Sequence, residues 1–132
     1  MAQGSTSFHE AEDHLRVETR DLHRAIVSLM EELEAIDWYQ QRIDAVRDGE
    51  LREILRHNRD EEMEHAALLL EWIRRRCPDF DVRLRPRLFT EGEIVEREEA
   101  LETNATATGN GASASARLTG PSVTIGSLRE DR

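Results

Sequence analysis

Apolar residues recur at helical intervals through the first third of the chain. The main series places one apolar side chain per heptad at Leu15, Leu22, Leu29, Ile36 and Ile43, with Ile26 and Leu33 between them. This spacing is the period of one face of an α-helix. The pattern predicts a long helix that begins between His9 and Asp13 and continues to about Val46.

A second stripe of the same period follows, and its centre is polar. Its members are Leu51, Leu55, Asn58, Glu62, His65, Leu69 and Trp72. The stripe predicts a helix from Glu50 to about Arg76, which ends there because the residue before Pro78 resists helical geometry. Glu62 and His65 therefore stand on a face that should be core. An unpaired carboxylate is costly to bury, so it is normally matched by a partner charge or a metal.

The two helices are separated by turn-forming residues at positions 47–49. Such a short turn predicts an antiparallel hairpin, and a hairpin cannot enclose its own core. A short helix over about residues 79–89, interrupted by Pro86, and an acidic helical piece over residues 91–102 are expected to follow. The predicted fold is all-α. A two-helix hairpin, half of a four-helix bundle, and a short C-terminal helix form one domain over residues 1–102, which homodimerisation completes.

Glu62 and His65 lie three residues apart on one helix face and can ligate one metal ion, as the Glu-x-x-His elements of di-iron bundles do. A lone Glu-x-x-His also arises by chance on charged helices. A second carboxylate supports the metal interpretation, because Glu32 lies about 60° from Leu29, on the shoulder of the first apolar stripe. Tyr39, one heptad later, falls on the same shoulder, where its hydroxyl can hold Glu32 or a metal-bound oxygen.

These ligands make up half of a di-iron site. A complete site takes a Glu from each of two helices and a Glu-x-x-His from each of two more. The chain has no second copy of either element. Two chains must supply them, which predicts a symmetric dimer with the metals on its axis.

Other acidic and histidine side chains form two groups on outer helix faces. They are Glu31 with Glu34, three residues apart, and His57 with Glu61 and Glu64 on one face of the second helix. Both groups can attract a hydrated cation, although an ordinary solvated helix surface produces such patterns more often. Trp38 lies nearly opposite Leu29 on the first helix. It either packs on the third helix or forms a second subunit interface, and the pattern favours neither.

The composition excludes some classes of partner. The formal net charge is −10, and 35% of the 132 residues are charged. This charge argues against nucleic acid and anionic membranes as partners and favours cations. We see no apolar run of the ~18 residues that span a bilayer and no signal peptide, and Cys77 is the only cysteine. We therefore expect an intracellular, soluble protein.

The sequence changes character after residue 102. Residues 103–120 consist mainly of Thr, Asn, Ala, Gly and Ser, which predicts a flexible linker. Large apolar residues return in the segment 121–132, at Val123, Ile125 and Leu128. A short apolar segment on a long tether is suited to docking in a groove of another protein. The alternative is a hydrophobic terminus without a role.

Three stretches carry a resemblance to a known family. MEELEAIDWY and HNRDEEMEHA, within residues 21–76, resemble the encapsulated ferritins, and TIGSL at residues 124–128 resembles the peptide by which cargo binds the inner wall of encapsulin shells. The resemblance implies a half-ferritin chain that dimerises to build a ferroxidase centre and assembles into a ring-shaped decamer. It also implies iron oxidation in the bacterial or archaeal cytoplasm, inside an encapsulin nanocompartment that stores the mineral.

The resemblance also assigns roles to residues. Ligands of two irons per subunit pair map onto Glu32, Glu62 and His65 of two chains, with Tyr39 beside them. Cation-uptake positions map onto Glu31 and Glu34, and an outer site for calcium or another divalent ion maps onto His57, Glu61 and Glu64. Subunit interfaces map onto Trp38 and Tyr39. Shell docking maps onto Thr124, Ile125, Gly126, Ser127 and Leu128.

Two other functions compete with this interpretation. A non-catalytic adaptor would use the metal to staple a helical dimer and the tail to dock it in a shell. A rubrerythrin-type peroxidase is a weaker alternative, because the cysteines of its usual electron-transfer domain are missing. Turnover separates the adaptor from the ferroxidase, since a structural site binds metal and oxidises nothing.

Overall fold

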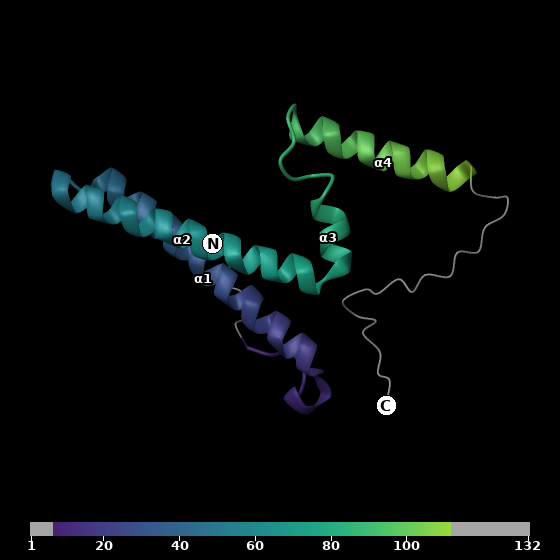
Figure 1. Cartoon of the computed structure of the whole chain (residues 1–132), viewed down its shortest axis with the longest axis horizontal. Coiled ribbons are helices and arrows are strands. Elements are labelled where there is room, and N and C mark those ends of the chain that lie inside the picture. Colours follow the sequence, from purple (N-terminus) through teal and green to yellow (C-terminus); the bar gives the residue numbers. More distant parts are fainter. Residues whose placement is uncertain (1–6, 112–132) are drawn as a thin grey trace. The chain divides into compact units, whose positions relative to one another are not determined.

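The computed structural model describes residues 7–111, and all regular structure in this part of the chain is helical. The elements are a 3-10 turn (Glu12–His14), α1 (Val17–Ala45), α2 (Gly49–Arg76), α3 (Pro78–Leu84) and α4 (Ile94–Gly111) (Figure 1). The described residues contain no strand, so the all-α prediction is confirmed. None of these helices is long and apolar enough to cross a membrane. The chain divides into two compact units, the first ending at Arg76 and the second beginning at Cys77.

The first unit is the predicted hairpin, in which α1 packs against α2. Its connection is short because α2 begins directly after Asp48, whose Oδ1 accepts a hydrogen bond from the Leu51 amide at 2.7 Å. The Arg52 guanidinium reaches back to the Val46 carbonyl at 2.5 Å. These two bonds satisfy backbone groups that helix ends leave free. The first helix starts later than the pattern predicts, at Val17, after a separate 3-10 turn.

The core of the hairpin is thin. Its buried side chains are Ala25, Ile43, Ala66 and Ile73, and among the described residues no side chain is completely buried. Apolar side chains remain exposed on both helices, at Ile26, Met30 and Leu33 of α1 and at Leu51, Ile54, Met63 and Leu68 of α2. The two helices bury only part of their apolar surface against each other, as expected of half a bundle. Homodimerisation itself stays a prediction.

The second unit contains two helices joined by turns. The third helix ends at Leu84 rather than continuing towards Phe89. In the turns that follow, the backbone amides of Arg87 and Leu88 donate hydrogen bonds to the Leu84 carbonyl. Pro86 has no amide hydrogen to continue the helical bonding, which explains the early end. The Arg87 guanidinium binds Glu98 of α4 through both carboxylate oxygens, at 2.7 and 2.8 Å.

The last helix corrects the predicted linker boundary. It continues through residues 103–111, nine positions into the segment expected to be linker. Threonine hydroxyls in this stretch donate to carbonyls four residues earlier, from Thr103 to Glu99 at 2.8 Å and from Thr106 to Glu102 at 2.6 Å. Such local bonds occupy side-chain donors without breaking the helix. The rest of the predicted linker, residues 112–120, and the segment 121–132 lie outside the described residues.

Candidate metal centre

The three residues predicted to bind iron form one cluster on the hairpin. Glu32 comes from α1, and Glu62 and His65 come from adjacent turns of α2. Each offers one ligand atom, and these atoms all lie within 4.8 Å of one another. This is the only group of three such ligands within residues 7–111. The helical spacing of Glu62 and His65 points both side chains toward α1, where Glu32 meets them.

Within the cluster, the shortest distance joins the two residues of α2. The Nδ1 atom of His65 lies 3.0 Å from Oε2 of Glu62 and 3.8 Å from Oε2 of Glu32. The two carboxylate side chains are about three-quarters covered, with 25% and 23% exposed, whereas the imidazole is 54% exposed. The open side of the cluster is therefore the histidine side. One hairpin covers the carboxylates but leaves the ligand set accessible.

The carboxyl groups of Glu32 and Glu62 share a hydrogen bond, which shifts their pKa values in opposite directions. Contact with Glu62, together with partial burial, raises the pKa of Glu32. The same contact and the bond with His65 lower the pKa of Glu62. Hydrogen bonding to Glu62 raises the pKa of His65. Of the two acids, Glu32 therefore takes up a proton more readily, and a proton held between them limits their mutual repulsion.

The chemistry of these donors fits ferrous iron. Carboxylate and imidazole ligands suit Fe(II), while a site built for a soft metal would contain thiolates. The chain offers only Cys77, which is buried and belongs to the second unit. Three protein ligands on one hairpin also leave coordination positions open. The set can hold a divalent cation and leaves room for ligands from elsewhere.

Tyr39 is not part of the cluster on this hairpin. It lies seven residues after Glu32, which is about 10.5 Å along a helix at 1.5 Å per residue. Its half-buried ring contacts the guanidinium of Arg42, whose Cζ lies 5.6 Å from the ring centroid. A role for Tyr39 at the metal therefore requires a second chain and stays a prediction.

The outer candidate residues are exposed and do not form a compact ligand group. Glu31, Glu34 and Glu64 are exposed. His57 and Glu61 form an ion pair on α2, with 3.1 Å between Nε2 and Oε1. Trp38 is 44% exposed on the hairpin, so it is available for a partner surface. Cation uptake and subunit packing at these residues stay predictions.

The profile of the EncFtn-like family matches residues 7–91 of this chain. This chain belongs to the EncFtn-like family. The match spans the whole hairpin and α3, so it includes all three residues of the metal cluster.

Several relatives support the family assignment. An encapsulated ferritin-like protein of Rhodospirillum rubrum is 53% identical over 130 residues, covering 98% of this chain and 92% of the relative. A ferritin-like protein of Thermotoga maritima is 50% identical over 102 residues, covering 77% and 90%. An encapsulin nanocompartment cargo protein of Myxococcus xanthus is 36% identical over 100 residues, covering 71% and 76%.

The fold of this EncFtn-like chain also occurs in a solved structure. A crystal structure of a protein from Nitrosomonas europaea superposes with a TM-score of 0.64 at 59% sequence identity. The match covers 67% of this chain and 97% of the other. The shared part is therefore nearly the whole of the solved chain.

Proposed function

We propose that this protein is a ferroxidase, which oxidises Fe(II) to Fe(III) with dioxygen at a di-iron site shared by two subunits. The observation that carries the proposal is the convergence of Glu32, Glu62 and His65 within 4.8 Å on a hairpin with much exposed apolar surface. Two such hairpins supply four carboxylates and two imidazoles, the ligand set of a di-iron carboxylate bundle. The encapsulated ferritin-like relative at 53% identity supports this assignment.

The ligands suit iron as a substrate that enters, reacts and leaves. Four carboxylates at one site stabilise two divalent ions and favour the higher charge of the oxidised product. In the balanced reaction, two Fe(II) ions are oxidised to two Fe(III) ions, while one dioxygen takes up their two electrons and two protons to become one hydrogen peroxide. Metal binding needs Glu32 and Glu62 to be ionised, because ligating carboxylates are deprotonated.

The location and assembly follow from the relatives and the tail. The cargo name of the Myxococcus relative supports an encapsulin shell as the partner, in the bacterial or archaeal cytoplasm. Residues Thr124–Leu128 are the docking segment in this proposal. They lie outside the described residues, so the support comes from their sequence. Two different hairpin surfaces, around the cluster and around Trp38, allow dimers to join into a closed ring such as a decamer.

Anaerobic loading followed by air exposure tests the proposal. The purified protein is titrated with Fe(II) under nitrogen, then oxygen is admitted and Fe(III) absorbance is followed while native mass is recorded. We expect about one iron per chain, half of a di-iron centre, and oxidation faster than in protein-free buffer. Iron binding without faster oxidation would assign a structural metal and an adaptor function instead.

A matched variant makes the assay specific. Glu53 lies on α2 and pairs with Arg56 of the same helix, away from the cluster. Glu53→Ala removes one carboxylate from the same helix without touching a ligand. It should oxidise Fe(II) at the rate of the unaltered protein, whereas loss of activity here would point to a general charge effect.

A further inference from the structure

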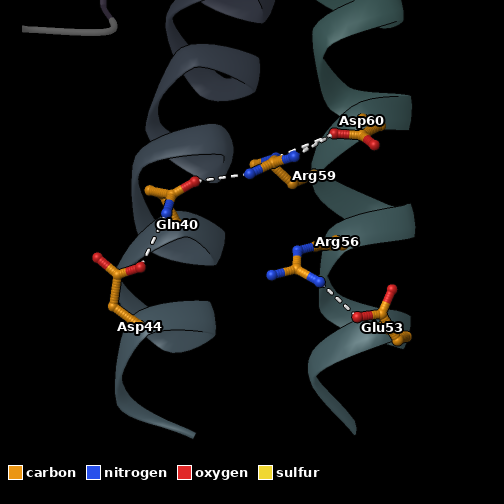
Figure 2. Close-up of polar contacts among 6 residues, drawn as sticks. All are labelled: Gln40, Asp44, Glu53, Arg56, Arg59 and Asp60. Carbon is orange, nitrogen blue, oxygen red and sulfur yellow. Dashed lines mark hydrogen bonds and ion pairs between the residues drawn. The ribbon is translucent and has the colours of Figure 1, made fainter. Parts of the chain in front are cut away.

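A polar bridge crosses the hairpin between the metal cluster and the turn. The Arg59 guanidinium of α2 donates to the Gln40 side-chain oxygen of α1 at 2.7 Å. The same guanidinium binds Asp60 at 2.7 and 3.0 Å, and the Gln40 amide donates to Asp44 at 3.0 Å. Figure 2 shows this continuous series from Asp44 to Asp60. Both members of the bridge are therefore held by a second partner on their own helix.

The neighbouring Arg56 does not form such a bridge. Arg56 lies one turn earlier on α2 and pairs with Glu53 on the same helix (Figure 2). Among residues 7–111, its hydrogen bond and ion pair are with Glu53 and not with α1. The side chain of Arg59 is only 21% exposed, while that of Arg56 is 46% exposed. The two arginines thus differ in whether they join the helices.

Apolar packing alone defines the register poorly beside the cluster. The stripe of α2 carries Asn58, Glu62 and His65 in succession where apolar residues would otherwise interlock. The hairpin core has two alanines among its four buried residues. The short turn holds the helices at one end, but a shift of α2 against α1 beside the cluster would separate His65 from Glu32. It would also break the bridge from Arg59 to Gln40, because both contacts join the same two helices.

We infer that Arg59 is a positioning residue for the metal centre: its bond to Gln40 holds α2 against α1 beside the cluster, and thereby fixes the distance from Glu32 to Glu62 and His65. Gln40 lies eight residues after Glu32 on α1, about 12 Å along the helix. The bridge therefore acts from outside the ligand set. This inference rests on the proposed metal centre and deepens it.

The action is geometric rather than electrostatic. The positive charge of Arg59 is already matched by Asp60. The groups that shift the pKa of Glu62 are Glu32 and His65, and Arg59 is not among them. Replacing Gln40, which is uncharged, should therefore have the same effect as replacing Arg59.

Cobalt(II) binding to the full-length protein tests this inference, because its visible absorption reports ligand geometry without turnover. Arg59→Leu and Gln40→Leu should each weaken Co(II) binding about 10-fold, as loss of residues that orient ligands does, and alter the absorption spectrum. The double variant should lose no more than either single one. Gln40→Glu keeps an oxygen that accepts from Arg59 but loses the bond to Asp44, so it should bind Co(II) more tightly than Gln40→Leu does.

Arg56→Leu is the matched control and should bind Co(II) as the unaltered protein does. The inference is overturned if Arg59→Leu and Gln40→Leu keep the original affinity and spectrum, or if Arg56→Leu loses as much. Should Arg59→Leu not fold, Gln40→Leu decides alone. Failure of the proposed function is seen separately, as Co(II) binding by the unaltered protein without Fe(II) oxidation.

Discussion

His65 approaches Glu32 across the hairpin, with 3.8 Å between Nδ1 and Oε2. This contact unites an α2 residue with an α1 residue 33 positions earlier in the sequence. It converts a common Glu-x-x-His pattern into a cluster with a third ligand. Without Glu32, the remaining pair on α2 would be an ordinary ion pair on a helix surface.

Removal of any cluster ligand should abolish rapid iron oxidation. Glu32→Ala, Glu62→Ala and His65→Ala each delete one donor from both halves of a shared site, so the loss is doubled in the dimer. We expect oxidation to approach the protein-free rate, measured by Fe(III) absorbance after air exposure. Circular dichroism checks that the helices remain. Undiminished oxidation in the triple variant would refute the site.

Metal affinity should depend steeply on pH. Glu62 stabilises the imidazolium and raises the pKa of His65 above its ordinary value of about 6.5. Because protonated imidazole cannot ligate, one proton must leave, and below this pKa the affinity falls about tenfold per pH unit. Co(II) titrations between pH 6 and 8 measure the slope. His65→Ala should bind weakly with a shallower slope, and an equally steep slope in this variant would assign the proton to another group.

Without metal, the contact between His65 and Glu62 should stabilise the fold less as the pH rises, which is opposite to the trend in metal affinity. A raised histidine pKa means that the folded state binds the proton more tightly than the unfolded state. The contact of His65 with Glu62 therefore stabilises the fold fully below about pH 6.5, and this contribution is lost as the pH rises through the folded pKa. The hairpin gains its metal ligand at the pH where it loses an ion pair.

Sequence periodicity was sufficient for the hairpin and the cluster. Both helices have stripes that repeat along one face, and a helix face fixes which residues point together, so Glu62 and His65 could be placed side by side from their spacing. Glu32 was found because it interrupts the edge of an apolar stripe. The hairpin topology followed from a short turn, and these features depend only on local geometry.

Other features depend on contacts that periodicity does not encode. The bridge from Arg59 to Gln40 needs the axial register of two helices and the reach of a long side chain, so nothing in the sequence singled it out. The extent of α4 was missed because threonine, asparagine and glycine are poor helix formers, whereas in the structure the Thr103 hydroxyl bonds locally within the helix. The predicted role of Tyr39 at the metal needs a second chain, whose position the pattern of one chain does not encode.

The exposed apolar surface beside the cluster should be a subunit interface. Leu33 follows Glu32 and is 54% exposed on the hairpin. Leu33→Glu places a charge in this surface, which must be desolvated on association, so native mass should shift toward the monomer and iron oxidation should fall. Val17→Glu adds the same charge at an exposed site at the start of α1 and should change neither. If the Leu33→Glu variant still forms a dimer, the subunit interface lies on another part of the hairpin.

The apolar contacts between α1 and α2 should carry much of the hairpin stability. Ile73 is 4% exposed, so Ile73→Ala leaves a cavity and should lower the free energy of unfolding by about 2–4 kcal/mol. Urea unfolding of the metal-free protein measures the change. Leu68→Ala, at a side chain 71% exposed, is the control and should cost much less on an isolated hairpin. A large cost at Leu68 would show that this residue is covered in the assembled protein.

Loading into a shell should depend on the tail and not on the metal centre. Deleting residues 121–132 removes Thr124, Ile125, Gly126, Ser127 and Leu128 but leaves every cluster ligand in place. Co-expression with an encapsulin shell protein, followed by purification of the shells, should then recover shells without this protein, because a short apolar segment on a tether provides the binding energy. The truncated protein should still oxidise Fe(II) in free solution.

Conversely, Glu62→Ala should load normally and oxidise nothing, since docking and chemistry reside in different segments. Loading that persists after the deletion would place the shell contact on the helical part of the chain, and oxidation lost with the tail would mean that the tail contributes to the metal centre.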